Sequence, residues 1–501
     1  MPGLTATTTI AGDTVIAEPI GLFRGHISLM HGWIPATVQI LAAVLLLLAV
    51  GWRTRRWRRV LLPVAAGCGV ALAGIVYWGI ASNGLSGEPA PAGLWVWLAL
   101  TGLAAGVAVL GWHSANRWRR VVAVAAVPMT AAAAGLMLNG WVGYYPTVQT
   151  AWGQLTGGPL PGQTDHDTVT RMVTAGTVPE RGKVVPVTTP SEISKFRHRG
   201  ELVYLPPVYF SSNPPPALPV VMMIGGQFNT PADWIRTANA VGTIDEFAAR
   251  HDGNAPVFVF PDSGGAFNND TECVDGVRGN AAQHLIREVV PYLVDTFGVS
   301  DDPANWGTVG WSSGGTCALN MAVKYPELFS AFVDIDGDLS PNAGTKEQTI
   351  ERLHGGNAAA WEDWDPATVM GRHGRYDGVA GWFAVSEPPG AEVAAISGDD
   401  LQGAAPESDP SANPTSAART LCRIAATHGI ECSVVPQAGK HDWPFAARAF
   451  ASSLPWLAAR IGTPDVPEVP LPGTFGQAEG VTIAAEAGPV GTPPNRPTGV
   501  R

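Results

Sequence analysis

The residues that could most clearly do chemistry surround one serine in the C-terminal two-thirds of the chain. Gly310-Trp311-Ser312-Ser313-Gly314 has the G-x-S-x-G pattern, follows the short run 307–309 and opens a helical stretch, 316–325. A tight turn between strand and helix strains the serine backbone, and the two glycines leave room for neighbouring backbone. The pattern predicts that Ser312 is a nucleophile.

A serine hydroxyl needs a general base, which in turn is held by a carboxylate. His441 follows the apolar run 432–436 and precedes a predicted final helix, 443–461, so a loop can carry it over Ser312. The other histidines after Ser312 lie in a polar insertion or at a helix end: His354, His373 and His428. We therefore predict His441 as the base.

The acid is expected at the end of the strand that precedes the histidine. Asp400, which follows the predicted strand 392–397, is favoured over Asp399, and Glu407 is a third candidate. The sequence leaves these three open.

The oxyanion that forms after attack on a carbonyl needs backbone N–H donors. We expect one from Ser313, directly after the nucleophile. The other should come from Gly226, in the turn 225–227 after the apolar run 220–224.

Continuous apolar runs must position these residues. They alternate with helical stretches such as 281–297, and they occupy 184–187, 202–205, 220–224 and 257–260. Such runs are typical of a mostly parallel sheet that is buried on both faces. The fold class predicted for a catalytic domain at 183–462 is therefore α/β, of the α/β-hydrolase type.

The first third of the chain contains four apolar segments of about the 20 residues that cross a bilayer. They are 33–52, 60–82, 94–112 and 121–145. None of the four segments contains Asp, Glu, Lys or Arg, so an all-α membrane anchor is favoured over an ion pathway.

Arginines cluster in two of the connections, 53–59 and 117–120. The positive-inside rule places both in the cytoplasm, so the N-terminal segment 1–32 and the catalytic domain are expected outside, on a multi-pass protein of the cell membrane. Gly51-Trp52 with Arg56-Trp57-Arg58-Arg59-Val60 recurs as Gly111-Trp112 with Arg117-Trp118-Arg119-Arg120-Val121, which indicates a duplicated hairpin.

Two further segments have compositions that do not favour a core. We expect a Gly/Pro/Thr-rich linker at 146–182 and a disordered tail at 463–501.

Charge and cysteine usage narrow the partners. The formal net charge of −11 argues against nucleic acid. Four of the five cysteines lie in the polar two-thirds, which fits an oxidising compartment, and Cys422 with Cys432 is the preferred disulfide pair. No His/Cys/Asp group has the spacing of metal ligands, so neither metal nor cofactor is expected.

Over 183–461 the sequence resembles the esterase family that includes esterase D-like enzymes and the mycolyltransferases of the antigen 85 complex. The resemblance rests on 203–209, Gly225-Gly226, 260–262, the turn at Ser312, Tyr325-Pro326 and 439–443. It implies roles for Ser312, His441, Asp400 and the amides of Ser313 and Gly226. The N-terminal third looks like that of actinobacterial membrane-anchored esterases.

Two functions follow as hypotheses. The first is a membrane-anchored, extracytoplasmic serine esterase or acyltransferase that acts through an acyl-enzyme on an acylated cell-envelope substrate, with water or a sugar such as trehalose as acceptor. The second is an inactive hydrolase-fold scaffold or binding protein of the envelope.

Overall fold

The computed structural model describes residues 27–51, 53–82, 90–388, 390 and 394–473. They form two compact units that divide between Pro159 and Leu160, with Asp442–Pro444 grouped with the first. Most of the predicted N-terminal segment 1–32 and the tail from 474 onward lie outside the described residues.

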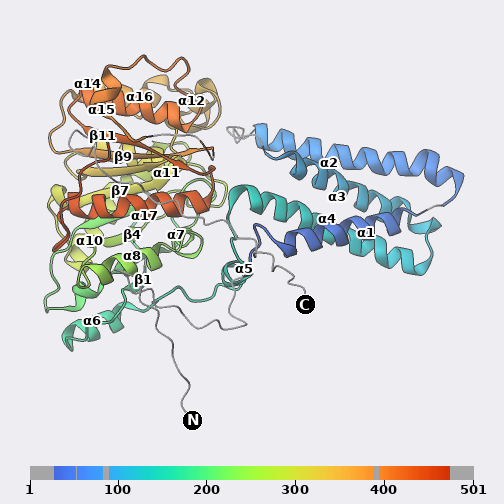
Figure 1. The fold of residues 1–501 in the computed structure, drawn as a ribbon, viewed down its shortest axis with the longest axis horizontal. Coiled ribbons are helices and arrows are strands. Elements are labelled where there is room, and N and C mark those ends of the chain that lie inside the picture. The colour runs from blue at the N-terminus through green and yellow to red at the C-terminus, as the bar shows by residue number, and fades with distance from the viewer. Residues whose placement is uncertain (1–26, 52, 83–89, 389, 391–393, 474–501) are drawn as a thin grey trace, which may run out of the picture. The chain divides into compact units, whose positions relative to one another are not determined.

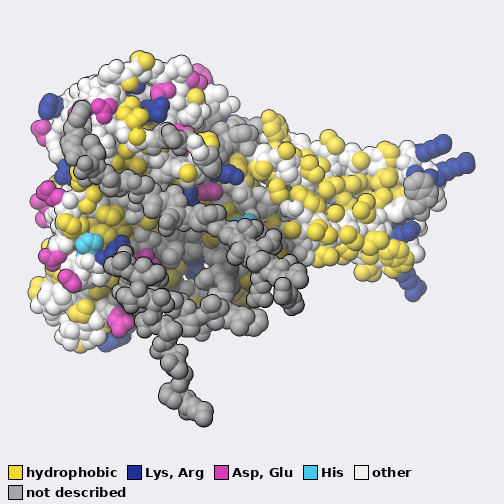
Figure 2. Space-filling model, viewed as in Figure 1, with side chains coloured by type: hydrophobic (Ala, Val, Ile, Leu, Met, Phe, Trp, Pro, Cys, Tyr) yellow, Lys and Arg dark blue, Asp and Glu magenta, His cyan; other side chains and the backbone are white. Residues whose placement is uncertain are grey.

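The first unit is helical (Figure 1). Its helices are α1 (Trp33–Val50), η1 (Trp57–Leu61), α2 (Leu62–Ser82), α3 (Ala92–Leu110), η2 (Trp112–Ser114), α4 (Arg117–Val142) and α5 (Val148–Leu155). Four stretches are long and apolar enough to cross a membrane: Trp33–Val50, Trp57–Ile80, Ala92–Leu110 and Arg117–Val142. Figure 2 shows apolar side chains over the visible face of this bundle and basic side chains at one end.

Small residues let two of these helices approach closely. A Cβ on Gly69 of α2 would lie 2.3 Å from the carbonyl oxygen of Ala99 on α3, and one on Gly106 would lie 2.8 Å from Ala65. Helices in a membrane associate through such close contacts between small residues, because no hydrophobic driving force brings apolar side chains together in lipid.

The two arginine-rich connections lie at the same end of the bundle. Arg53 Nη1 donates to the carbonyl oxygen of Gly111 at 2.9 Å. The two copies of the repeated sequence pack differently: Trp57 of the first copy is fully buried, whereas Trp118, at the same position of the second copy, is 48% exposed.

The second unit is built on one nine-stranded sheet with the order β1-β2-β4-β3-β7-β8-β9-β11-β10. Its strands are β1 (Lys183–Val187), β2 (Glu201–Leu205), β3 (Val220–Ile224), β4 (Val257–Phe260), β7 (Trp306–Trp311), β8 (Ala331–Ile335), β9 (Ala380–Glu387), β10 (Ile396–Ser397) and β11 (Glu431–Ala438). The six strands from β4 to β11 in this order pair in parallel, and β1, β2 and β10 are antiparallel at the edges. A separate hairpin pairs β5 (Asp275–Gly276) with β6 (Gly279–Asn280).

Helices cover both faces of the sheet (Figure 1). They are α6 (His166–Thr174), η3 (Pro207–Phe210), α7 (Asp233–Arg236), α8 (Ala240–Arg250), α9 (Ala281–His284), η4 (Leu285–Val289), α10 (Val290–Phe297), η5 (Pro303–Asn305), α11 (Ser313–Lys324), α12 (Lys346–His354), α13 (Ala358–Glu362), α14 (Pro366–His373), α15 (Gly398–Gln402), α16 (Pro414–Thr427) and α17 (Trp443–Arg460). Alternate strand residues face opposite layers. In β4, Val257 and Val259 join the core cluster that includes α10, α11 and α16, whereas Phe258 contacts Phe450 of α17. The predicted α/β-hydrolase fold, preceded by an all-α domain, is confirmed.

The expected linker and the start of the expected tail both contact the second unit, and the polar insertion is helical. The expected linker 146–182 holds α5 and α6, and Val169 and Val173 of α6 join the core, so the second unit begins near Leu160. The polar insertion after β8 forms α12, α13 and α14, with Trp361 and Trp364 buried. At the start of the expected tail, Ser433 Oγ donates to the carbonyl oxygen of Pro472 at 2.6 Å.

Two disulfides lie in the second unit. One joins Cys422 to Cys432, the pair preferred from the sequence. The other joins Cys273, in the loop after β4, to Cys317 on α11, a pair that the sequence did not single out. Cys68, in α2, is a free thiol.

Candidate active site

The nucleophile turn joins β7 to α11. Ser312 has φ 58° and ψ −129°, a conformation that costs a non-glycine residue of the order of 1–3 kcal/mol. A Cβ on Gly310 would lie 1.7 Å from the carbonyl oxygen of Gly314, and one on Gly314 would lie 2.5 Å from that of Ile224. Both glycines are therefore required by close backbone contacts, and the turn holds Ser312 at the carboxyl end of the sheet.

His441 lies in the loop between β11 and α17. Its Nε2 is 3.0 Å from Ser312 Oγ, within hydrogen-bond distance. The side chain is partly exposed, at 23%, so its ring edge remains accessible from solvent. The structure thus brings together the two residues that the sequence predicted as nucleophile and base.

The carboxylate beside His441 belongs to Asp336, which is not one of the three acids predicted from the sequence. Asp336 Oδ2 lies 3.3 Å from His441 Nδ1, and the side chain is fully buried. The backbone of β9 holds this residue at two points: the Asp336 N–H donates to the carbonyl oxygen of Ala384 at 2.9 Å, and Asp336 Oδ1 accepts the N–H of Ser386 at 2.7 Å. The residue directly follows β8, the parallel neighbour of the strand that carries Ser312.

The three predicted acids lie elsewhere, and this corrects the sequence-based assignment. Asp400 is exposed and accepts the hydroxyl of Ser397, the N-cap of its own helix, at 2.8 Å. Asp399 is exposed, and Glu407 pairs with Arg419. The reason is topological. Residues 392 and 393 of the expected strand lie outside the described part of the chain, and its end, 396–397, is β10, which is antiparallel at the sheet edge and separated from β7 by β8, β9 and β11.

The amides of Gly226 and Ser313 lie next to the nucleophile. A Cβ on Gly226 would be 3.2 Å from Ser312 Cβ, and both residues line one small cavity. In the described part of the chain, neither N–H donates to another backbone carbonyl. This leaves two backbone donors beside Ser312, and backbone N–H groups are the kind of donor that stabilises an oxyanion.

Buried carboxyl groups surround this centre. Burial raises the pKa of Asp334, two residues before Asp336, to about 8, against one hydrogen bond from the Gly337 N–H. Burial also raises the pKa of Asp270 to about 6 and that of Glu272 well above its usual range. The loop that carries Asp270 and Glu272 is joined to α11 by the Cys273–Cys317 disulfide.

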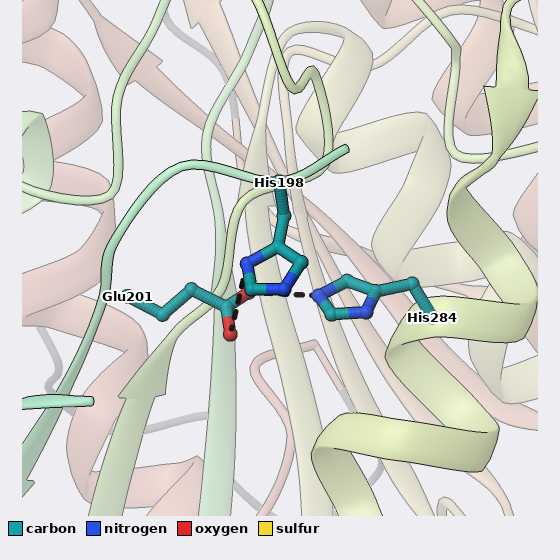
Figure 3. A group of neighbouring side chains, drawn as sticks. All are labelled: His198, Glu201 and His284. Atoms are coloured by element: carbon teal, nitrogen blue, oxygen red, sulfur yellow. Dashed lines mark hydrogen bonds and ion pairs between the residues drawn. The ribbon is translucent and has the colours of Figure 1, made fainter. Parts of the chain in front are cut away.

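A second polar group, away from Ser312, has the composition of a metal site. Figure 3 shows His198, Glu201 and His284, whose potential ligand atoms lie within 4.8 Å of one another. In this structure, however, each ring nitrogen faces an oxygen acceptor of the protein. His284 Nε2 and Nδ1 lie 3.0 and 2.9 Å from Glu201 and Glu288, and His198 Nδ1 and Nε2 lie 2.9 and 3.1 Å from the carbonyl oxygens of Arg199 and Thr189.

Nitrogens that donate to oxygen have no lone pair for a metal. Burial disfavours the charged form of His284, but its hydrogen bonds to Glu201 and Glu288 and their charges raise its pKa overall. The group is therefore a buried network of hydrogen bonds and ion pairs around His284. Glu201 also accepts the N–H of Asp262, whose carboxylate pairs with Arg199 at 2.6 Å.

A serine, a histidine and an aspartate in contact, at the carboxyl end of a mostly parallel sheet, define an α/β-hydrolase type of site. Comparison with known proteins agrees with this class. Residues 197–455 match the model of the Esterase family, described as "Putative esterase", and the chain belongs to that family. Its C-terminal unit is thus an esterase-family hydrolase.

Individual relatives are more distant. An uncharacterized protein of Corynebacterium glutamicum is 30% identical over 262 residues, which cover 51% of this chain and 59% of that protein, so the match spans less than two thirds of the relative. Among solved structures, a ferulic acid esterase is 18% identical with a TM-score of 0.42 and covers 56% of this chain and 99% of its own. An S-formylglutathione hydrolase from Agrobacterium tumefaciens is 16% identical with a TM-score of 0.43, over 57% and 97%. MPT51 of Mycobacterium tuberculosis is 18% identical with a TM-score of 0.34, over 55% and 99%.

Proposed function

We propose that this chain is a membrane-anchored serine esterase in which Ser312, His441 and Asp336 act as a triad through an acyl-enzyme. The observation that carries the proposal is the continuous contact from Ser312 Oγ to His441 Nε2, and from His441 Nδ1 to Asp336. The strained serine turn and the two unengaged amides beside it support the same reading.

The steps follow from these positions. His441 Nε2 takes the proton of Ser312 as Oγ attacks the ester carbonyl, and the amides of Gly226 and Ser313 hold the oxyanion. His441 then returns the proton to the departing alcohol, which leaves an acyl group on Ser312. Water then attacks this acyl group and gives its proton to His441. His441 returns that proton to Ser312 Oγ as the carboxylic acid departs, which restores the free serine. Asp336 stabilises the imidazolium in both halves.

If a hydroxyl replaces water in the second half, the same site is an acyltransferase. The polar cavity beside Ser313 favours a polar group in the substrate, and a sugar hydroxyl, such as one of trehalose, is the acceptor to test. Turnover of a short-chain ester that rises with added trehalose, together with an acylated sugar product, would assign transfer; unchanged turnover would assign hydrolysis.

The four apolar helices would anchor the enzyme, with both arginine-rich connections in the cytoplasm and the esterase unit outside, facing acylated substrates of the cell envelope. Support comes from the hydrogen bond between Arg53 and Gly111, which holds the two connections at one end of the bundle. Protease added to intact cells should cut within the esterase unit and leave the arginine connections intact. The reverse pattern would invert the topology.

The direct test of the chemistry is labelling of the full chain in detergent with a fluorophosphonate. We expect wild type to be labelled, Ser312→Ala to be unlabelled, and His441→Ala to label far more slowly. A folded wild type that does not react would favour an inactive scaffold on the hydrolase fold.

A further inference from the structure

A small cavity of about 20 Å³ lies beside the proposed oxyanion amides. The turn 225–229, Ser313 and parts of the loop 263–273 line it. A site of roughly 10–15 Å³ by this measure holds one water molecule. The cavity therefore accepts one group of the size of water or ammonium next to the place where the ester carbonyl would sit.

The wall of this cavity is acidic. Asp270 and Glu272 both line it and are 8% and 4% exposed. Burial raises the pKa of both, and the charge of the exposed Asp338 adds to the effect. Arg278 opposes this at Asp270, where it also donates to the backbone carbonyl oxygen at 2.5 Å.

Two oxygen acceptors in the lining have no hydrogen-bond partner among the described residues. They are Oε2 of Glu272 and Oδ1 of Asn229, and Asn229 is only 9% exposed. A Cβ on Gly226 would lie 3.3 Å from Asn229 Oδ1, so this oxygen lies beside the oxyanion turn. A buried acceptor without a donor is destabilising, and a ligand with N–H groups would supply the missing donor.

The acidic wall is held in place. Glu272 and Cys273 both have left-handed backbone conformations, with φ 51° and 53°, and Cys273 is bonded to Cys317 on the helix that Ser312 begins. The carboxyl groups therefore keep a fixed position relative to the nucleophile. A fixed acidic wall, two vacant acceptors and room for one small group are together complementary to a cation with N–H donors.

We propose that this cavity binds a protonated amino group close to the ester carbonyl, so that the preferred substrates are aminoacyl esters. This inference rests on the proposed serine esterase function and specifies its substrate class. An ammonium donates to Asn229 Oδ1 and Glu272, and its positive charge favours the ionised form of the wall carboxyl groups, which burial disfavours. An acyl group that carries a methyl in the same place would leave both acceptors unpaired.

The test uses the full chain in detergent and two esters that differ only at this position, p-nitrophenyl L-alaninate and p-nitrophenyl isobutyrate. Each kcat/KM is divided by the rate of the same ester with hydroxide, which removes the intrinsic reactivity of the amino ester. We expect wild type to favour the alaninate by at least about tenfold at neutral pH, where its amino group is mostly charged and the pH lies above the pKa of Asp270.

Glu272→Gln and Asp270→Asn should each lower this preference about tenfold, whereas Glu246→Gln, an exposed acid on α8, should keep it. Thermal melting reports whether each variant folds, and the wild-type ratio stands even if one does not. Equal corrected rates in wild type, or a preference that survives in a folded Glu272→Gln, would overturn the inference while leaving the esterase intact. Absence of both hydrolysis and fluorophosphonate labelling would instead reject the proposed function.

Discussion

Replacing Asp336 with asparagine tests which carboxylate completes the triad. Asp336 Oδ1 accepts the N–H of Ser386 at 2.7 Å, so the asparagine carbonyl would keep that contact and its NH₂ would take the place of Oδ2. That NH₂ would then face His441 Nδ1, 3.3 Å away in the wild type. Nδ1 would have to become an acceptor, and Nε2 would carry the proton and could no longer take one from Ser312.

This wrong tautomer sets the expected size of the effect. In a serine protease triad the equivalent change costs about 10⁴ in kcat, which corresponds to about 5 kcal/mol. We expect a loss of about 10³–10⁴ in kcat for Asp336→Asn, with little change in folding, because the two side chains have the same shape.

Asp400→Asn is the matched control. It removes an exposed carboxylate that contacts only its own N-cap among the described residues, so kcat should stay within about twofold. Both variants would be assayed on p-nitrophenyl acetate and by the rate of fluorophosphonate labelling. A large loss in Asp400→Asn together with near-normal Asp336→Asn would refute the assignment made from this structure.

Three other predictions follow from the same contacts. Breaking Cys273–Cys317 by double alanine substitution should lower the free energy of unfolding by about 4 kcal/mol, against about 3 kcal/mol for Cys422–Cys432. The first disulfide closes a loop of 44 residues and the second a loop of 10, and a longer closed loop removes more conformational entropy from the unfolded chain. Equal losses in denaturant titrations would contradict this argument. Gly314→Ala places a Cβ 2.5 Å from a backbone oxygen and should abolish fluorophosphonate labelling. Gly371→Ala, with open space around it in α14, should be active and up to about 1 kcal/mol more stable. Normal labelling of Gly314→Ala would mean that the turn is not constrained. The pKa of His284 in the folded state is raised above 6.5, so its contribution to stability is complete below pH 6.5 and is lost as pH rises through the folded-state pKa. The Tm should therefore fall as the pH rises above 6.5. A His284→Gln variant whose Tm falls equally with pH would exclude His284 as the cause.

The residues that a local pattern determines could be predicted from the sequence. Ser312 sits in a turn whose glycines are required by contacts within five residues and with the adjacent strand, so the motif carries its own geometry. His441 was identifiable because it follows the last parallel strand and precedes the last helix. The four apolar helices needed only length and composition. By contrast, α6 has a polar composition with two buried valines, a signal too short to separate from a linker.

The acid could not be identified in this way, because a triad constrains only the distance from a carboxylate to Nδ1 and not the position of the carboxylate in the sequence. In a parallel sheet, the carboxyl ends of β8 and β9 both lie near the nucleophile strand, and each can supply the acid. The sequence does hold a usable signal, since Asp336 directly follows the apolar run of β8, the first strand after the nucleophile helix. Choosing Asp336 over an acid on the next strand requires the structure. That strand, β9, ends in Glu387, whose carboxylate accepts the hydroxyl of Thr415 at 2.8 Å. Choosing the triad acid is therefore a problem of strand neighbours, and it is decided by tertiary structure.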